Sequence, residues 1–157
     1  MDNKDKDFNV MLKNNKDIPK IITITDTASI EKYCGSRMYL APPAFYDELM
    51  KKVPFGKLVT IGMLREKLAR LAGADFTDPM TAGIFVNIAA WASSQRNTDE
   101  TLYWRTLKAN GELSAKYPGG VEAQAEKLRA EGHTITARGK KNLRYFVENY
   151  ENSLKEI

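Results

Sequence analysis

Two consecutive helix signals in the middle of the chain constrain its fold more than any other feature. Residues 61–73, IGMLREKLARLAG, carry leucines at helical spacing, with Thr60 as an N-cap and Gly73 as a helix-ending residue. Shortly afterwards, Asp78-Pro79 is typical of a second helix start, and that helix continues through MTAGIFVNIAAWASS. Two helices joined by so short a linker predict a helix-turn-helix.

The flanking segments extend this pattern on both sides. Upstream we expect a strand at 20–25, a short helix at 27–34, an extended piece at 37–40 and a helix from Pro42 to Pro54. Downstream we expect a β-hairpin within 100–120 turning at Asn110-Gly111, a helix at 121–132, a short strand at 133–137 and a last helix or extended arm at 140–157. This order predicts a mainly α winged helix-turn-helix with a small β wing.

Composition limits the classes of protein that the chain can represent. The 157 residues suit one domain, which we divide into a disordered tail (1–17), an N-terminal extension (18–41) and the winged-helix domain (42–157). Cys34 and His133 are the only residues of their kinds, which excludes an internal disulfide and a Cys/His metal cluster. The polar N-terminus does not resemble a secretory signal, so we expect a cytoplasmic protein without a cofactor. A net charge of +4 permits an anionic partner.

Three stretches in the same order resemble a known family. They are VPFGKLVTIGMLREKLARLAG, WRTLKANGELS and LRAEGHTITARGKKNLRYF, and the resemblance covers residues 43–146. They resemble the DNA-binding domain of alkylguanine-DNA alkyltransferases, and more closely the alkyltransferase-like proteins that lack the acceptor cysteine. The resemblance implies a winged helix-turn-helix that binds duplex DNA, including alkylated DNA, without enzymatic activity, and that has repair proteins as partners.

The sequence departs from the alkyltransferase pattern at its chemical centre. Aligned on Arg105 and Gly111, Tyr103 takes the place of the acceptor cysteine and Trp104 that of the activating histidine. A phenol and an indole cannot replace a thiolate beside an imidazole. The resemblance also implies a tyrosine where Ile61 stands, and an arginine finger where Gly83 stands. No Lys or Arg occurs from Leu71 to Gln95, so the finger is absent.

Three residues of the expected hairpin are candidates for a base pocket: Tyr103, Trp104 and Arg105. On a strand, Tyr103 and Arg105 share a face, which the resemblance places against an extruded base, while Trp104 points the other way. Tyr103 can stack on such a base. Alternatively, Tyr103 fills the former pocket and Trp104 packs the wing. The sequence alone does not decide whether Tyr103 lines an open base pocket or fills that pocket.

Two further groups are candidates for contacts with DNA. On the second helix, Thr81, Gly83 and Asn87 occupy the recognition position, while Ile84, Ile88 and Trp91 are expected in the core. The candidate backbone contacts are Lys57, Thr60, Lys108, Lys140 and Lys141. Lys51, Lys52, Lys116, Arg138 and Arg144 add to the positive charge.

These observations leave two main functions open. The first is a non-enzymatic, alkyltransferase-like DNA-binding protein that recognises alkylated guanine or a flipped base and signals repair. The second is a protein- or small-ligand-binding module that has lost DNA binding, which the apolar second helix favours. A minor third reading is a transferase that uses Cys34.

Overall fold

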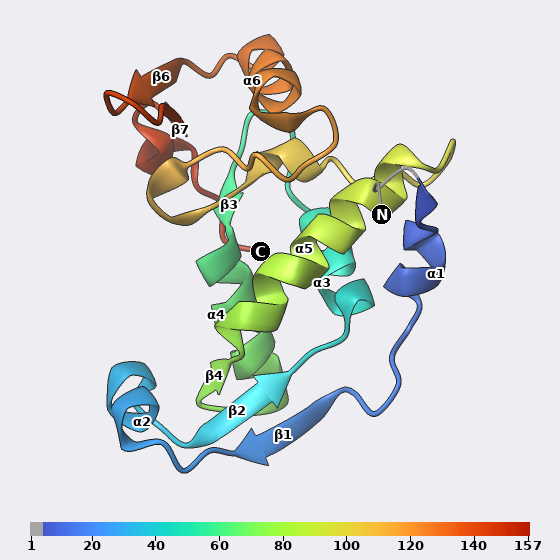
Figure 1. The fold of residues 1–157 in the computed structure, drawn as a ribbon, viewed down its shortest axis with the longest axis vertical. Helices are drawn as coiled ribbons and strands as arrows, with labels where there is room; N and C mark the ends of the chain where they lie inside the picture. The colour runs from blue at the N-terminus through green and yellow to red at the C-terminus, as the bar shows by residue number, and fades with distance from the viewer. Residues whose placement is uncertain (1–4) are drawn as a thin grey trace.

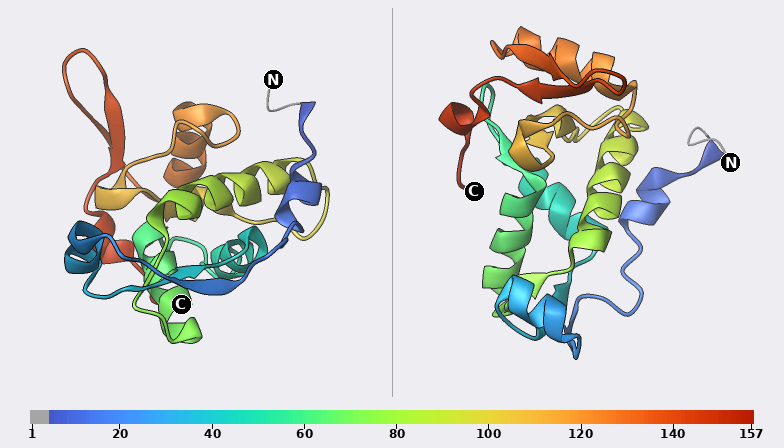
Figure 2. Two further views of the ribbon diagram at one scale, coloured as in Figure 1. Left: turned by 60° about the horizontal axis from the view of Figure 1, so that its bottom comes forward. Right: turned by 60° about the vertical axis from the view of Figure 1, so that its left-hand side comes forward.

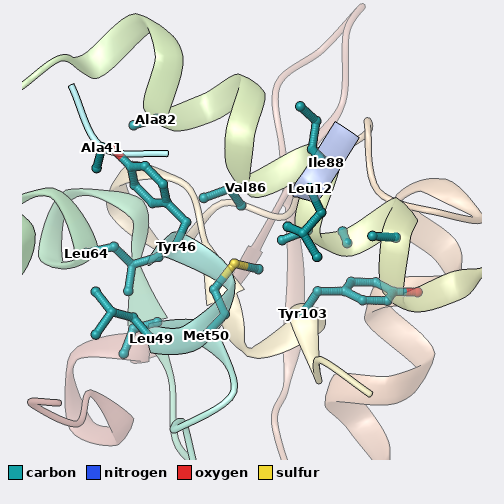
Figure 3. Close-up of a cluster of buried hydrophobic side chains, with 14 of the residues drawn as sticks. Leu12, Ala41, Tyr46, Leu49, Met50, Leu64, Ala82, Val86, Ile88 and Tyr103 are labelled. Atoms are coloured by element: carbon teal, nitrogen blue, oxygen red, sulfur yellow. The ribbon is translucent and has the colours of Figure 1, made fainter. Parts of the chain in front are cut away.

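One long helix, α5 (Pro79–Ser94), crosses the molecule and organises its core. The computed structural model describes residues 5–157. Helices α3 (Pro43–Met50) and α4 (Ile61–Ala72) pack against α5. Figure 3 shows how Tyr46 and Met50 of α3, Leu64 of α4 and Val86 of α5 converge in one cluster. These four side chains are fully buried.

Helices α4 and α5 confirm the predicted helix-turn-helix. The Thr60 hydroxyl accepts a hydrogen bond from the Met63 amide at 3.2 Å, and Gly73 ends α4 at a φ of +69°, which favours glycine. The Asp78 carboxylate accepts from the amides of Met80 and Thr81 and begins α5. The linker holds the short strand β4 (Phe76–Thr77).

The N-terminal extension is built into the helix-turn-helix through a sheet. Its strands β1 (Lys20–Thr23) and β2 (Arg37–Leu40) pair antiparallel, and β2 pairs in parallel with β4. Between them lies α2 (Thr27–Tyr33), and the Tyr33 ring stacks on Phe76 with centroids 4.5 Å apart. The extended segments and the short helix predicted here are confirmed, and they share a sheet with the domain that follows.

The expectation of a disordered tail is wrong for the part that the structure describes. Phe8–Leu12 form a short helix, α1, which lies beside the C-terminal half of α5 (Figure 1). Its Phe8 and Leu12 side chains are buried. The polar composition of this segment hid two apolar residues one turn apart, which is enough to dock one helical turn. Residues 1–4 of the predicted tail lie outside the described residues.

The hairpin expected within 100–120 is also wrong, although its turn is present. Asn110 and Gly111 adopt positive φ values of 63° and 81°, as a type I′ turn requires. The first arm instead forms the 3₁₀ turn η2 (Tyr103–Arg105) and strand β5 (Thr106–Leu107), which pairs in parallel with β3 (Val59–Thr60). After the 3₁₀ turn η3 (Ala109–Gly111), Glu112 bridges to Phe146. The two arms therefore pair with different partners.

The β wing of the fold lies further along the chain than expected. Strands β6 (Ile135–Arg138) and β7 (Arg144–Val147) form an antiparallel hairpin, which we call the wing, and it projects from the body (Figure 2). It follows α6 (Gly120–Ala130), which confirms the predicted helix there. The short strand predicted at 133–137 is confirmed as β6. Of the two alternatives for 140–157, the last helix is wrong and the extended arm is nearer to the structure, because the chain forms β7 and then only the 3₁₀ turn η4 (Tyr150–Ser153). No helix within residues 5–157 has the length and apolar character to cross a membrane.

Candidate nucleic-acid interface

The outward face of α5 is apolar and open at its N-terminal half. Met80 is 76% exposed and Ile84 52% exposed, so the expectation that Ile84 is a core residue is wrong. Ile88 is buried as expected, and Trp91 is half-buried. Of the predicted recognition residues, Gly83 faces open space and Asn87 is half-buried. The Thr81 hydroxyl donates to Asp78 at 2.8 Å, so this side chain stabilises the helix start.

A groove runs beside the C-terminal half of this face. It has a volume of about 710 Å³ and lies between α5, α1 and the loop at 115–120. The Phe8 and Trp91 rings stack 5.6 Å apart, and the Trp91 indole donates to the Lys116 carbonyl at 2.8 Å. The groove is lined by Lys6, Phe8, Met11, Ile84, Asn87, Ile88, Trp91, Ala115, Lys116, Tyr117, Gly119 and Gly120. Sequence reasoning missed Phe8 and Met11, because it treated their segment as a tail.

Tyr103 lies in the core behind the groove. It is 7% exposed, and its ring makes edge-on contacts with Trp104 and Tyr117 at centroid distances of 5.5 and 5.3 Å. Burial raises the pKa of the Tyr103 phenol, so it stays protonated near neutral pH. Tyr117 also lines the groove and donates its hydroxyl to the Thr106 carbonyl at 2.8 Å. This packing favours the alternative in which Tyr103 fills the former pocket over the one in which it lines an open base pocket.

Arg105 is a buried structural cation and does not face an open pocket. Its Nε lies 2.9 and 3.0 Å from the two carboxylate oxygens of Glu131, and its Nη1 donates to the Val53 carbonyl at 2.8 Å. The same carboxylate accepts from the Trp104 indole at 2.6 Å and from the Gly56 amide at 2.8 Å. We call Gly56, Trp104, Arg105 and Glu131 the Glu131 knot.

The shared open face expected for Tyr103 and Arg105 is therefore wrong, because this segment is a 3₁₀ turn, in which side chains do not alternate. Glu131 was not identified from the sequence. It lies 26 residues after Arg105, and no local spacing links the two.

The predicted backbone contacts divide into exposed and occupied groups. The side chains of Lys57, Lys108, Lys140 and Lys141 are exposed, and Lys108 also pairs with Glu112 at 3.6 Å. Thr60 is half-buried and caps α4. Lys51 pairs with Asp47 and Asp99 at 3.3 and 2.8 Å, so it is tied to carboxylates of the protein.

The wing concentrates positive charge more than any neighbouring segment. Residues 138–144, RGKKNLR, contain four cations and no acid. Arg138 lies 4.3 Å above the Phe146 ring, and a concavity of about 340 Å³ opens between this strand and Asn110. Arg144 donates to both carboxylate oxygens of Glu112 at 2.8 and 2.5 Å, which lowers the pKa of Glu112. Since Arg138, Lys140 and Lys141 are exposed, they are available to an anion.

The two residues considered for nucleophilic or acid–base chemistry lie apart from Tyr103. Cys34 is exposed and ends α2 in the left-handed conformation. His133 follows α6, and burial lowers the pKa of its imidazole. They stand on different elements, and neither belongs to the 3₁₀ turn where the resemblance places the acceptor.

Comparisons with known proteins agree with the fold. No protein-family model and no curated protein matches the sequence. Among solved structures, S. pombe Atl1 in complex with damaged DNA containing O6-carboxymethylguanine matches with a TM-score of 0.50 at 16% identity, covering 73% of this chain and 94% of Atl1. S. pombe ATL in complex with DNA matches with a TM-score of 0.48 at 18% identity, over the same shares of the two chains. The chain thus has the fold of the alkyltransferase-like protein Atl1, a helix-turn-helix with a wing, as the sequence predicted.

Proposed function

We propose that this protein is a non-enzymatic, alkyltransferase-like DNA-binding protein that recognises alkylated guanine and signals its repair. The observation that carries the proposal is the fold shared with Atl1, a protein crystallised on damaged DNA. The position expected for an acceptor thiol holds the buried phenol of Tyr103. Alkyl transfer needs a thiolate and a base that activates it, and this segment has neither.

The charge distribution supports backbone contacts outside α5. The helix contributes no Lys or Arg, whereas the wing carries four cations in seven residues. Lysine and arginine side chains on such a projecting hairpin can neutralise phosphates without reading bases. Duplex binding should therefore depend strongly on salt and weakly on sequence.

The test is a titration of fluorescently labelled duplex, with and without an alkylated guanine, at two salt concentrations. Log affinity should fall with log salt by about 0.9 per phosphate contact, and Lys140→Ala with Lys141→Ala should reduce that slope by roughly one to two units. The matched control is Lys13→Ala with Lys16→Ala, which removes the same charge from an exposed segment next to α1. Intact-mass spectrometry after incubation with the alkylated duplex should show an unmodified chain. An adduct on Cys34, or no duplex binding even at low salt, would contradict the proposal.

A second candidate function rests on the groove beside α5. A concavity of about 710 Å³, lined by Phe8, Trp91 and Tyr117, is of the size and character that small organic ligands occupy. If duplex binding is absent, the same titration should be repeated with aromatic small molecules and read by Trp91 fluorescence. Because Trp104 also fluoresces, a Trp91→Phe variant assigns the signal.

A further inference from the structure

We propose that the free edge of strand β1 pairs with the same edge of a second copy of this chain, so that two molecules share one continuous sheet. Such pairing is independent of DNA binding. Strand β1 is the outermost strand of the sheet β1-β2-β4, and Figure 1 shows it at the end of the molecule opposite the wing. An outermost strand presents unpaired backbone groups that can bind a further strand.

The register of the sheet shows which backbone groups of β1 are free. In an antiparallel pair, every second residue exchanges hydrogen bonds with the neighbouring strand. The Ile24 amide donates to the Ser36 carbonyl at 2.8 Å, and the same alternation continues at Ile22, which lies opposite Met38. Even-numbered residues therefore bond to β2. The odd-numbered residues turn their amides and carbonyls to the free edge, and they are Ile21, Thr23 and Thr25.

Strand β1 lacks the features by which proteins usually protect a sheet edge, which are prolines, bulges and several charges. Its ladder with β2 is continuous from Lys20 to Thr23, and Lys20 is the only charged residue within it. The segment KIITIT is rich in β-branched residues, which favour strands. Ile21 packs against the core, whereas Ile22, on the opposite face, is 37% exposed. The edge is therefore a suitable template for another strand.

The side chains of this edge are complementary to themselves. In an antiparallel pairing whose two-fold axis passes through Thr23, Ile22 lies opposite Ile24 of the second copy, and Lys20 lies opposite Asp26. Asp26 keeps extended backbone angles, with a φ of −70° and a ψ of 113°, so the pairing can reach it. Apolar side chains then face each other, and a cation faces an anion at both ends. An axis at Ile22 would instead place Lys20 opposite Ile24, so charge selects the register.

Lys20 and Asp26 are both available for this contact. The Lys20 ammonium lies 2.5 Å from Asp17, and its three donors and 40% exposed side chain leave room for a second carboxylate. The exposed Asp26 carboxylate accepts from the Ser29 amide and hydroxyl at 3.2 and 2.6 Å and retains capacity for further donors. Because exposed ion pairs contribute little and the edge is short, we expect a weak dimer that depends on concentration.

The first measurement is the oligomeric state. Light scattering over about a hundredfold range of concentration should show a monomer that converts to a dimer as the concentration rises. Thr23→Lys places two ammonium groups opposite each other at the axis and should weaken the association at least about tenfold. The matched control, Thr23→Val, keeps a β-branched side chain and should retain the dimer. Thr23 is exposed, so both variants should fold, as thermal melting would verify.

Disulfide trapping in a Cys34→Ser background tests the register. Thr23→Cys places its two copies opposite each other, where Cα atoms about 5.5 Å apart permit a disulfide. Thr25→Cys is the matched control. Its residue lies opposite Ile21 of the second copy, so its two thiols are separated by about 14 Å along the strands. Oxidation should therefore cross-link the Thr23→Cys variant and spare the Thr25→Cys variant.

The two measurements together decide the proposal. A chain that stays monomeric at every concentration overturns the pairing of two copies and leaves the edge to a strand of another protein. A dimer that is unchanged in Thr23→Lys uses another surface and also overturns it, as does equal cross-linking of the two cysteine variants. Dimer loss in Thr23→Lys, together with cross-linking at Thr23 alone, supports it. None of these outcomes depends on whether the chain binds DNA.

Discussion

The Glu131 knot contains one arginine–glutamate pair, Arg144 of the wing forms a second pair with Glu112, and the two arginines differ in exposure. In the knot, the side chains of Arg105 and Glu131 are 7% and 4% exposed. In the wing pair, Arg144 is 61% exposed and Glu112 10%. Both arginines bind both oxygens of their carboxylate at hydrogen-bond distance.

The difference in exposure separates a structural role from an available charge. A buried ion pair is dehydrated, so each partner depends on the other and on further hydrogen bonds, which Val53, Gly56 and Trp104 supply or receive. In the second pair Glu112 is buried but Arg144 keeps water on one side, so this pair is less dehydrated and contributes less to stability than the knot. Arg105, which was expected to line a base pocket, is therefore part of the scaffold. The free cations lie in the wing, whose first strand was predicted and whose second half was predicted as a helix or extended arm.

Removal of one partner from the knot should have the largest effect. Glu131→Ala leaves the Arg105 guanidinium buried without a counter-charge and removes the acceptor for Trp104 and Gly56. We expect a loss of about 3–5 kcal/mol in the free energy of unfolding, measured by urea denaturation. Glu126→Ala, at an exposed acid on α6, which Glu131 directly follows, is the control and should change it little. Equal effects of the two variants would show that the knot is not a special structural unit.

The second largest loss of stability is expected on truncation of Tyr103, whose ring contacts Trp104 of the Glu131 knot. Tyr103→Ala opens a cavity against Trp104 and Tyr117 and should cost about 3 kcal/mol of unfolding free energy. Tyr103→Phe keeps the ring and should preserve most of the stability. In both variants, the affinity for alkylated duplex per folded molecule should stay close to that of the unaltered protein. A selective loss of affinity for the alkylated duplex would show instead that Tyr103 lines the base pocket.

Arg144→Ala should have the smallest effect on the free energy of unfolding, but it should change how that free energy depends on pH. The hydrogen bond from Arg144 holds the pKa of Glu112 below its ordinary value. Glu112 therefore stabilises the folded state above the carboxyl pKa of the unfolded chain, and this contribution is lost as the pH falls through the lowered folded pKa. Arg144→Ala should flatten that acid limb, as measured by denaturation at pH 7 and pH 3. An unchanged acid limb would assign the pH dependence to other carboxylates.

The parts of the fold that were predictable are those with local signals. Thr60, Gly73 and Asp78 act within three or four residues of themselves, and the helix ends they mark are where the sequence placed them. The Asn110-Gly111 turn is equally local and is present. The predictions that were wrong depend on residues far apart in the chain. Strand β5 pairs with β3, and Glu112 pairs with Phe146 of β7. A turn signal cannot specify which strand its arms will join.

The candidate site was predictable to a similar extent. The absence of cations on α5 and their presence in the wing were visible in the sequence. The open face of α5 was not, because alanines, valine and isoleucines surround the helix and give no clear polar side. The cover over its second half comes from Phe8, about 80 residues earlier. Only the folded chain shows which half of the helix stays open.

The docking of α1 on α5 also limits the stretch of the proposed duplex that α5 itself can contact. A helix of 16 residues is about 24 Å long, but the open N-terminal half measures only about 12 Å. At 3.4 Å per base pair, this length spans about three to four base pairs. A contact so short, made by apolar side chains, cannot select a long sequence. It suits a feature that is itself one base pair wide, such as a single modified base.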